Sequence, residues 1–236
     1  MKVAILGSGS WATALAKIVL NNVDEIHWFI RKQETIDEFI ENRRNPKHLE
    51  WAYFDTSKIY FSTDINEVLD LSNTIILAIP SPYVKSCLDD ITIDISGKRI
   101  ISAVKGMIPD ENILVTDYLH QHYGIPEENL GIVAGPCHAE EIALERLSYL
   151  TLGCTNLDNA NLWSQLLTTK YVHVTSSNDV VGLEYSSVMK NIYAIAAGMC
   201  SSLRYGDNFQ AVLLTNAMHE SMRFAQAKSP IQRDIT

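Results

Sequence analysis

Short apolar runs alternate with helical patterns through the first two-thirds of the chain. Residues 74–79, Thr-Ile-Ile-Leu-Ala-Ile, are typical of a strand that is buried on both faces of a parallel sheet. The pattern predicts strands at 3–6, 26–30, 59–61, 74–79, 99–104, 130–134, 149–153 and 171–175. It predicts helices at 10–21, 34–43, 64–70, 82–89, 112–122, 139–145 and 158–167. This alternation indicates an α/β fold, a Rossmann-like doubly wound and mostly parallel sheet.

The pattern becomes purely helical after about Ser176. Residues 179–227 carry long helical stretches that are interrupted only around 204–208. We therefore expect a sheet domain over 1–178 and the start of an all-helical C-terminal domain over 179–236, with too few helices to close a core of its own. These helices either pack onto the sheet domain, or a partner subunit or further chain completes them.

A glycine-rich segment follows the first predicted strand directly. Gly7-Ser-Gly-Ser-Trp-Ala12 matches the pattern G-x-G-x-x-G/A in the order strand, turn and helix. Gly7 permits the tight turn, Gly9 lets a pyrophosphate approach the backbone, and Ala12 lets the helix pack closely on the strand. The N-terminus of the helix favours phosphate groups. The segment predicts an NAD(P)-binding domain over 1–178.

Two cations follow the second predicted strand, where such folds contact the adenosine ribose. An acidic residue at this place selects NAD, and a basic one accommodates the additional phosphate of NADP. The chain has Arg31-Lys32 here, and arginine binds phosphate through two parallel hydrogen bonds. NADP is the favoured cofactor and NAD remains the alternative.

Composition excludes several other classes of function. The net charge of −9 argues against a nucleic-acid partner. No apolar stretch approaches the roughly 18 residues of a membrane span, and the first strand leaves no room for a signal peptide. The cysteines form no C-x-x-C pair, and His120 and His122 would point to different faces of a helix. We expect a cytoplasmic protein with reduced thiols and no metal site.

Candidate substrate residues follow the ends of two later strands. Lys105-Gly106 follows the strand at 99–104, and Gly135-Pro-Cys-His-Ala139 follows the strand at 130–134. Ligands of open α/β sheets bind beyond the carboxyl ends of the strands. Lys105 alone is equally consistent with a surface lysine.

Lys190 is a third candidate, in an apolar helix. Ala194 and Ala197 share its face, while Val188, Ile192, Ile195 and Met199 form a separate apolar stripe. Buried lysines need partners, so we expect Lys190 to face a polar cleft, with extension into solvent as the alternative.

Together these segments resemble the bacterial-type NAD(P)-dependent glycerol-3-phosphate dehydrogenase family over essentially the whole chain. The matching motifs are Gly7-Ser-Gly-Ser-Trp-Ala-Thr-Ala-Leu-Ala16, Ile79-Pro-Ser81, Val104-Lys-Gly106, Ala134-Gly-Pro-Cys-His-Ala-Glu-Glu141, Val181-Gly-Leu-Glu184, Met189-Lys-Asn-Ile-Tyr-Ala-Ile-Ala-Ala-Gly198 and Gly206-Asp-Asn208. The resemblance implies reversible hydride transfer between dihydroxyacetone phosphate and sn-glycerol 3-phosphate, a precursor of glycerophospholipids. A homodimer is one candidate assembly.

The resemblance also implies roles for individual residues. Lys190 would be the proton acceptor, and Lys105 would contact both cofactor and substrate. Gly135 and Cys137 would border the substrate. The remaining cofactor contacts would be Ser10, Trp11, Arg31, Lys32 and Ala139, beside the glycines Gly7 and Gly9.

The sequence departs from the family at several places. Cys137 replaces a usual serine or threonine, and Asn216 replaces a common arginine. The family's later Gly-Asp-Leu and Arg-Asn segments do not occur between Asp207 and Thr236, which suggests a fragment. The alternatives are a non-catalytic NAD(P)-binding module and a reductase of another hydroxy acid or acyl thioester. A hydroxyacyl thioester enzyme would need a His–Glu pair, for which His138 is the candidate.

Overall fold

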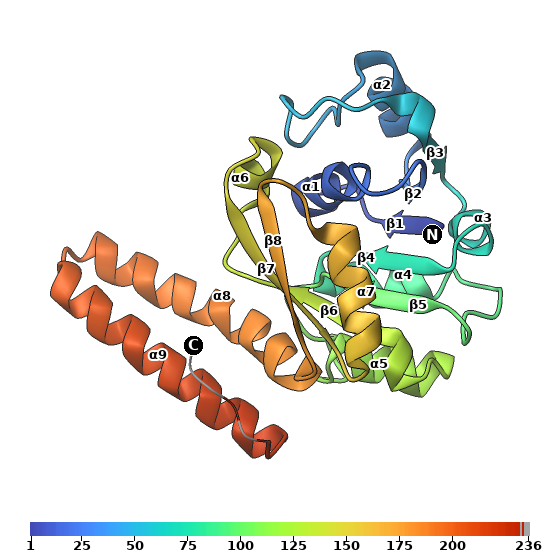
Figure 1. Cartoon of the computed structure of the whole chain (residues 1–236). Helices are drawn as coiled ribbons and strands as arrows, with labels where there is room; N and C mark the ends of the chain where they lie inside the picture. The colour runs from blue at the N-terminus through green and yellow to red at the C-terminus, as the bar shows by residue number, and fades with distance from the viewer. Residues whose placement is uncertain (232, 234–236) are drawn as a thin grey trace.

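A computed structural model of the protein describes residues 1–231 and 233. Eight strands form one sheet in the order β3-β2-β1-β4-β5-β6-β7-β8 (Figure 1). Only β6 and β7 pair antiparallel among these neighbours. The predicted doubly wound, mostly parallel sheet is confirmed. The strands are β1 (Val3–Leu6), β2 (Ile26–Phe29), β3 (Ile59–Ser62), β4 (Thr74–Leu77), β5 (Arg99–Ser102), β6 (Leu130–Ala134), β7 (Ser148–Cys154) and β8 (Val172–Ser177).

Helices cover both faces of the sheet, and each face has its own apolar core. Ile5 of β1 belongs to the core on one face, together with Trp28 and Trp163, whereas Leu6 belongs to the core on the other. Burial on both faces explains why the strands are continuous apolar runs. The first core is covered by α1 (Ser10–Val19), α2 (Gln33–Asn42), α6 (Ala139–Ala143) and α7 (Leu157–Leu167), and the second by α3 (Ile65–Asp70), α4 (Val84–Leu88) and α5 (Val115–Tyr123).

Helix α5 begins three residues later than the predicted start at 112. Asp110 and Asn112 have positive φ angles of 67° and 54°, and Ile108 and Ile113 form an antiparallel bridge around them. Asparagine and aspartate tolerate this left-handed conformation in turns. The turn therefore takes up the residues that the apolar spacing assigned to the helix.

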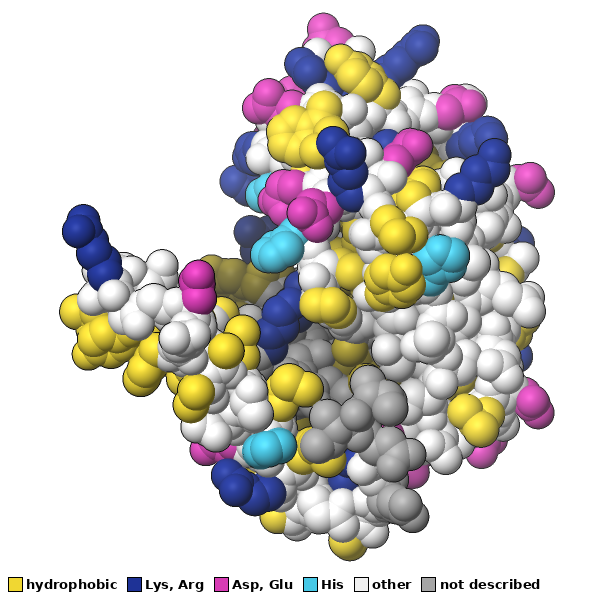
Figure 2. Space-filling model, turned by 60° about the vertical axis from the view of Figure 1, so that its left-hand side comes forward, with side chains coloured by type: hydrophobic (Ala, Val, Ile, Leu, Met, Phe, Trp, Pro, Cys, Tyr) yellow, Lys and Arg dark blue, Asp and Glu magenta, His cyan; other side chains and the backbone are white. Residues whose placement is uncertain are grey.

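The C-terminal part is a helical hairpin of α8 (Val180–Ser202) and α9 (Asp207–Lys228), which extends away from the sheet (Figure 1). The break expected at 204–208 is the turn, where Arg204 and Gly206 have positive φ. Many large apolar side chains of the hairpin are exposed, among them Ile192, Ile195, Met199, Leu203, Val212, Leu214 and Met218. Most of the apolar stripe of α8 is thus exposed, and hydrophobic side chains gather on the surface of the projecting hairpin (Figure 2). The division into two domains stays a prediction.

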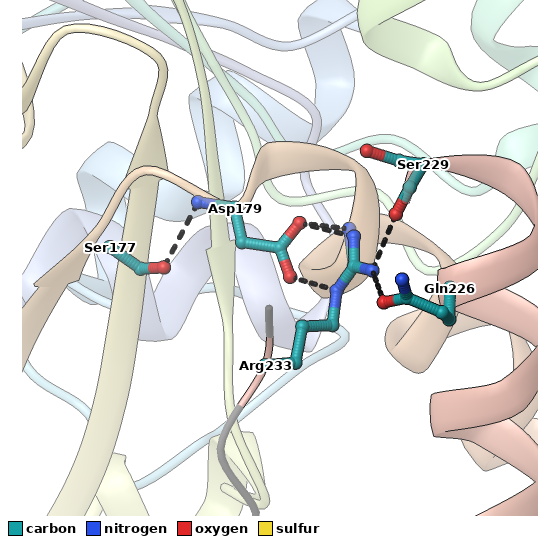
Figure 3. Close-up of polar contacts among 6 residues, drawn as sticks. Ser177, Asp179, Gln226, Ser229 and Arg233 are labelled. Carbon is teal, nitrogen blue, oxygen red and sulfur yellow. Dashed lines mark hydrogen bonds and ion pairs between the residues drawn. The ribbon is translucent and has the colours of Figure 1, made fainter. Parts of the chain in front are cut away.

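An ion pair ties the segment after α9 to the start of α8 (Figure 3). Asp179 caps α8 by accepting a hydrogen bond from the Gly182 N–H at 2.9 Å. Arg233 donates to both carboxylate oxygens of Asp179, from Nε at 2.5 Å and from Nη2 at 2.8 Å. The guanidinium also donates to the Ser229 carbonyl at 2.6 Å. Both ends of the hairpin are therefore joined at its base.

The described residues were also searched for membrane-spanning helices and for groups of metal ligands. None of their helices is both long and apolar enough to cross a membrane. Within the same part of the chain, no three His, Cys, Asp or Glu side chains group as metal ligands. The four cysteines, all of them in this part, are free thiols.

Candidate functional site

The glycine turn between β1 and α1 is shaped by the two glycines in different ways. Gly7 has φ +118°, and a Cβ there would collide with the carbonyl oxygen of Ala78. A Cβ at Gly9 would meet no atom within 4 Å, so open space lies in front of this backbone. Trp28 holds the turn by donating from Nε1 to the Gly7 carbonyl at 2.7 Å. The turn is rigid and leaves room for a phosphate group at the N-terminus of α1.

Arg31 and Lys32 lie beside this turn, and their predicted contact with a cofactor stays a prediction. Both are exposed and follow β2, and both line a pocket of about 240 Å³ that Ser8 of the glycine turn also lines. The pocket therefore joins the turn to the two cations. This arrangement suits a ligand that carries phosphate at two separate places.

Lys105 follows β5, and its side chain contacts Trp11 in the first turn of α1. Its Nζ lies 4.7 Å from the centre of the Trp11 ring, which is within the range of a cation–π interaction. The Trp11 Nε1 atom is buried and has no hydrogen-bond partner. Protein atoms remove part of the Lys105 ammonium from water, which lowers its pKa, and the positive charge of Lys190 lowers that pKa further.

Lys190 reaches the same edge of the sheet from α8. Its Nζ lies 3.5 Å from the carbonyl oxygen of Gly135, directly after β6. The next residue, Asn191, donates from Nδ2 to the Lys105 carbonyl at 3.2 Å. Lys190 is exposed rather than enclosed, and basic side chains lie in the hollow between hairpin and sheet (Figure 2). Helix α8 therefore brings two lysines together over the carboxyl ends of β5 and β6.

The segment after β6 packs tightly against β7. Gly135 has φ +154°, and a Cβ there would approach the Tyr149 carbonyl oxygen to 2.7 Å. The Cys137 thiol is buried and donates to that same oxygen at 3.0 Å. Ala139 is buried at the start of α6. The Cys137 thiol thus holds the loop to β7, and its contact with a substrate stays a prediction.

Glu184 has a structural role that the sequence motif did not reveal. Its buried carboxylate accepts hydrogen bonds from the backbone N–H groups of Val115 at 3.0 Å and Thr116 at 3.3 Å, and from the Thr116 hydroxyl. It therefore caps α5, whose own N-cap residue, Leu114, provides no acceptor. An acidic residue in an apolar helix, and a helix without a capping residue, were the available signals.

The pKa of Glu184 reflects two opposing effects. Burial raises the pKa of this carboxyl from 4.5 to about 7, although the hydrogen bonds from Thr116 favour the charged form. The nearby Asp117 carboxylate raises the pKa further. The group that fixes α8 against α5 therefore titrates near neutral pH.

Comparison with known proteins identifies the family of the chain. The family described as NAD-dependent glycerol-3-phosphate dehydrogenase N-terminus matches residues 2–160, and its C-terminal counterpart matches residues 179–233. The chain belongs to the NAD-dependent glycerol-3-phosphate dehydrogenase family. This confirms the resemblance seen in the motifs.

Individual members of the glycerol-3-phosphate dehydrogenase family match along nearly the whole chain. A protein of Exiguobacterium sp. named glycerol-3-phosphate dehydrogenase (NAD(P)+) is 33% identical over 223 residues, which are 94% of this chain and 65% of that protein. A protein of the same name, numbered 1, from Lactobacillus delbrueckii is 31% identical over 232 residues, covering 96% of this chain and 68% of its own length. A Plasmodium falciparum glycerol-3-phosphate dehydrogenase structure matches with a TM-score of 0.88 and 26% identity, covering 99% of this chain and 68% of that one. The chain thus spans about two-thirds of the length of these dehydrogenases.

Proposed function

We propose that the chain is an NAD(P)-dependent oxidoreductase that interconverts dihydroxyacetone phosphate and sn-glycerol 3-phosphate, with NADP as the favoured cofactor. The observation that carries this proposal is that two lysines lie near each other at the carboxyl edge of the sheet. Lys105 lies over the Trp11 ring and Lys190 lies beside the Gly135 carbonyl, close enough for its charge to lower the pKa of Lys105. Two cations there suit a small phosphorylated substrate on which negative charge develops. The product would serve glycerophospholipid synthesis.

The residues of the glycine turn fit a dinucleotide. Gly7, Gly9, Ser10 and Trp11 would hold the diphosphate, because the space before Gly9 is open and α1 begins there. The other cofactor residues would be Arg31 and Lys32 at the adenosine end, with Lys105 and Ala139 nearer the nicotinamide. A bound nicotinamide supplies or accepts the hydride.

The protein residues would provide the proton and the charge. In the reducing direction the Lys190 ammonium would donate a proton to the ketone oxygen, and in the oxidising direction the neutral amine would accept it from the hydroxyl. Lys105 would stabilise the negative charge of the same substrate, and Gly135 and Cys137 would border it. Asn191, next to Lys190 on α8, would hold that helix at a fixed position relative to Lys105 through its hydrogen bond to the Lys105 carbonyl.

A non-catalytic NAD(P)-binding module is the second candidate, since Lys190 and much of the hairpin are exposed. Two measurements on the purified chain separate the candidates. NADPH binding is measured by the change in tryptophan fluorescence, and turnover by the loss of NADPH absorbance with dihydroxyacetone phosphate. We expect both binding and turnover. Binding without turnover would support the module, and turnover only with another hydroxy acid or an acyl thioester would contradict the proposed substrate.

A further inference from the structure

The loop that follows α2 brings a third cation to the adenosine end of the proposed cofactor site. Lys47 lines the pocket of about 240 Å³ together with Arg31 and Lys32, although Lys47 lies 15 residues further along the chain than Lys32. All three side chains are exposed at its rim. Sequence reasoning assigned only the two adjacent cations to this place.

A buried asparagine holds this loop on the glycine turn. Asn45 is fully buried, and its Nδ2 donates to the Ser8 carbonyl at 2.9 Å and to the Thr13 hydroxyl at 2.8 Å. Its Oδ1 accepts the Lys47 backbone N–H at 3.0 Å. The position of the Lys47 backbone is therefore set by the same turn that would bind the diphosphate.

A second contact fixes the following residue of the loop. His48 Nδ1 lies 3.2 Å from the Ser10 hydroxyl, at the first position of α1. Two successive residues of the loop, Lys47 and His48, are thus held against the glycine turn. The loop needs little rearrangement to meet a ligand, so little of its binding energy is lost to ordering.

The side chains that line the pocket differ in charge from those that line the hollow beside it. Among the described residues, the side chains that line the pocket of about 240 Å³ include Arg31, Lys32 and Lys47 and no carboxylate. The same three cations also line an adjoining hollow of about 570 Å³, and two carboxylates, Glu34 and Glu38, line that hollow but are not among the residues of the smaller pocket. In a chain with a net charge of −9, this pocket is a local concentration of positive charge. It suits a doubly charged phosphate better than the neutral ribose hydroxyl of NAD.

We propose that Lys47 is a third cation that binds the 2′-phosphate of NADP, and that Asn45 is the positioning residue that places it there. The inference rests on the proposed function, and it adds a specificity-determining residue to the same site. Lys47 would contribute to the preference for NADPH over NADH and not to the chemical step.

The test compares Lys47→Ala with Lys170→Ala, which removes an exposed lysine outside the pocket. The affinities for NADPH and NADH are measured by tryptophan fluorescence. Lys47→Ala should weaken NADPH binding roughly 10- to 100-fold, the loss expected for one charge-assisted hydrogen bond, and NADH binding less than about twofold. Lys170→Ala should change neither affinity. If Lys47→Ala weakened the binding of NADPH and NADH equally, or weakened neither, the proposal would be overturned.

Adenosine 2′-phosphate and adenosine 5′-phosphate serve as probes that are independent of turnover. The wild-type chain should bind the 2′-phosphate more tightly, and Lys47→Ala should abolish that difference. If the wild-type chain binds neither NADPH nor NADH, the proposed function fails, whereas the two adenosine phosphates still test the pocket. Equal binding of the two probes by the wild-type chain would overturn the assignment of the pocket itself.

The positioning role of Asn45 is tested through the ratio of the affinities for NADPH and NADH. Asn45→Ala should lower the NADPH-to-NADH preference toward the value of Lys47→Ala, and the double variant should lower it no further. A loss of stability alone would weaken the binding of NADPH and of NADH equally and leave the ratio of the two affinities unchanged. An unchanged ratio, or additive losses in the double variant, would show that Asn45 does not act through Lys47.

Discussion

The buried carboxyl of Glu184 should make the stability of the fold depend on pH. Its pKa is raised from 4.5 to about 7, so the native state keeps this proton at pH values where the unfolded chain has lost it. For a carboxyl with a raised pKa, the contribution to stability is greatest below the unfolded value of 4.5. It is lost as the pH rises through the native value of about 7.

The size of the effect follows from the two pKa values. Each pKa unit corresponds to about 1.4 kcal/mol, so a rise from 4.5 to about 7 amounts to ~3 kcal/mol. Glu184→Gln keeps an acceptor for the N–H groups of Val115 and Thr116 but cannot titrate. The free energy of unfolding of the wild type should therefore fall by about 3 kcal/mol relative to Glu184→Gln between pH 4.5 and pH 8.

Urea unfolding followed by circular dichroism measures this difference at several pH values. Glu41→Gln, which changes an exposed carboxyl of α2, serves as the control for the loss of one carboxyl. The comparison with Glu184→Gln cancels the contributions of all ionisable groups that the two proteins share. A difference between wild type and Glu184→Gln that does not change with pH would refute the reasoning.

Three further predictions concern the cofactor site and the base of the hairpin. Gly9→Val should abolish NADPH binding with little change in circular dichroism, because its side chain would extend into open space in front of the turn; unchanged affinity would contradict the assignment of the turn. Arg31→Asp should weaken NADPH binding by about 2–3 kcal/mol and NADH binding much less, and equal losses in a titration would show that Arg31 does not meet the 2′-phosphate. Asp179→Ala should destabilise the fold more than Arg233→Ala, because Asp179 also caps α8. A double-mutant cycle in urea should give a coupling of about 1–3 kcal/mol, and no coupling would show that the pair is not formed in solution.

Much of the sheet and its covering helices could be predicted, because the strands are apolar on both faces whereas the helices are apolar on one face only. That difference appears directly in the spacing of apolar residues, as in the run at 74–79. The structure ends β4 at Leu77 and not at Ile79, although the Ala78 N–H still donates to the Leu6 carbonyl. Strand ends depend on pairing with neighbours, which spacing alone does not reveal.

The parts of the site that come from one motif were easier to predict than those that come from distant segments. Gly7 has a strict local requirement, because its φ is +118° and the Ala78 carbonyl leaves no space for a Cβ. The need for glycine at position 9 comes only from the proposed cofactor and stays a prediction. Asn45 and Glu184 act on residues 32 and 68 positions away through single polar contacts. Nothing in their local sequence marks those partners. The sequence predicts that Lys190 faces a polar cleft, and its Nζ does lie 3.5 Å from the Gly135 carbonyl oxygen, but the side chain is exposed. The apolar pattern of its own helix does not show how the helix is placed against the sheet.

Replacement of Lys190 tests the central claim most directly, because the proposed reaction needs a group that both carries charge and transfers a proton. Turnover of dihydroxyacetone phosphate with NADPH is measured for Lys190→Ala, Lys190→Arg and the control Lys170→Ala. We predict that Lys190→Ala lowers kcat by roughly 10²- to 10⁴-fold with little change in NADPH affinity. Lys190→Arg should restore little activity, since a guanidinium does not release its proton at a useful pH. Activity close to that of the wild type in Lys190→Arg would contradict the account, because the proton would then have to come from another group.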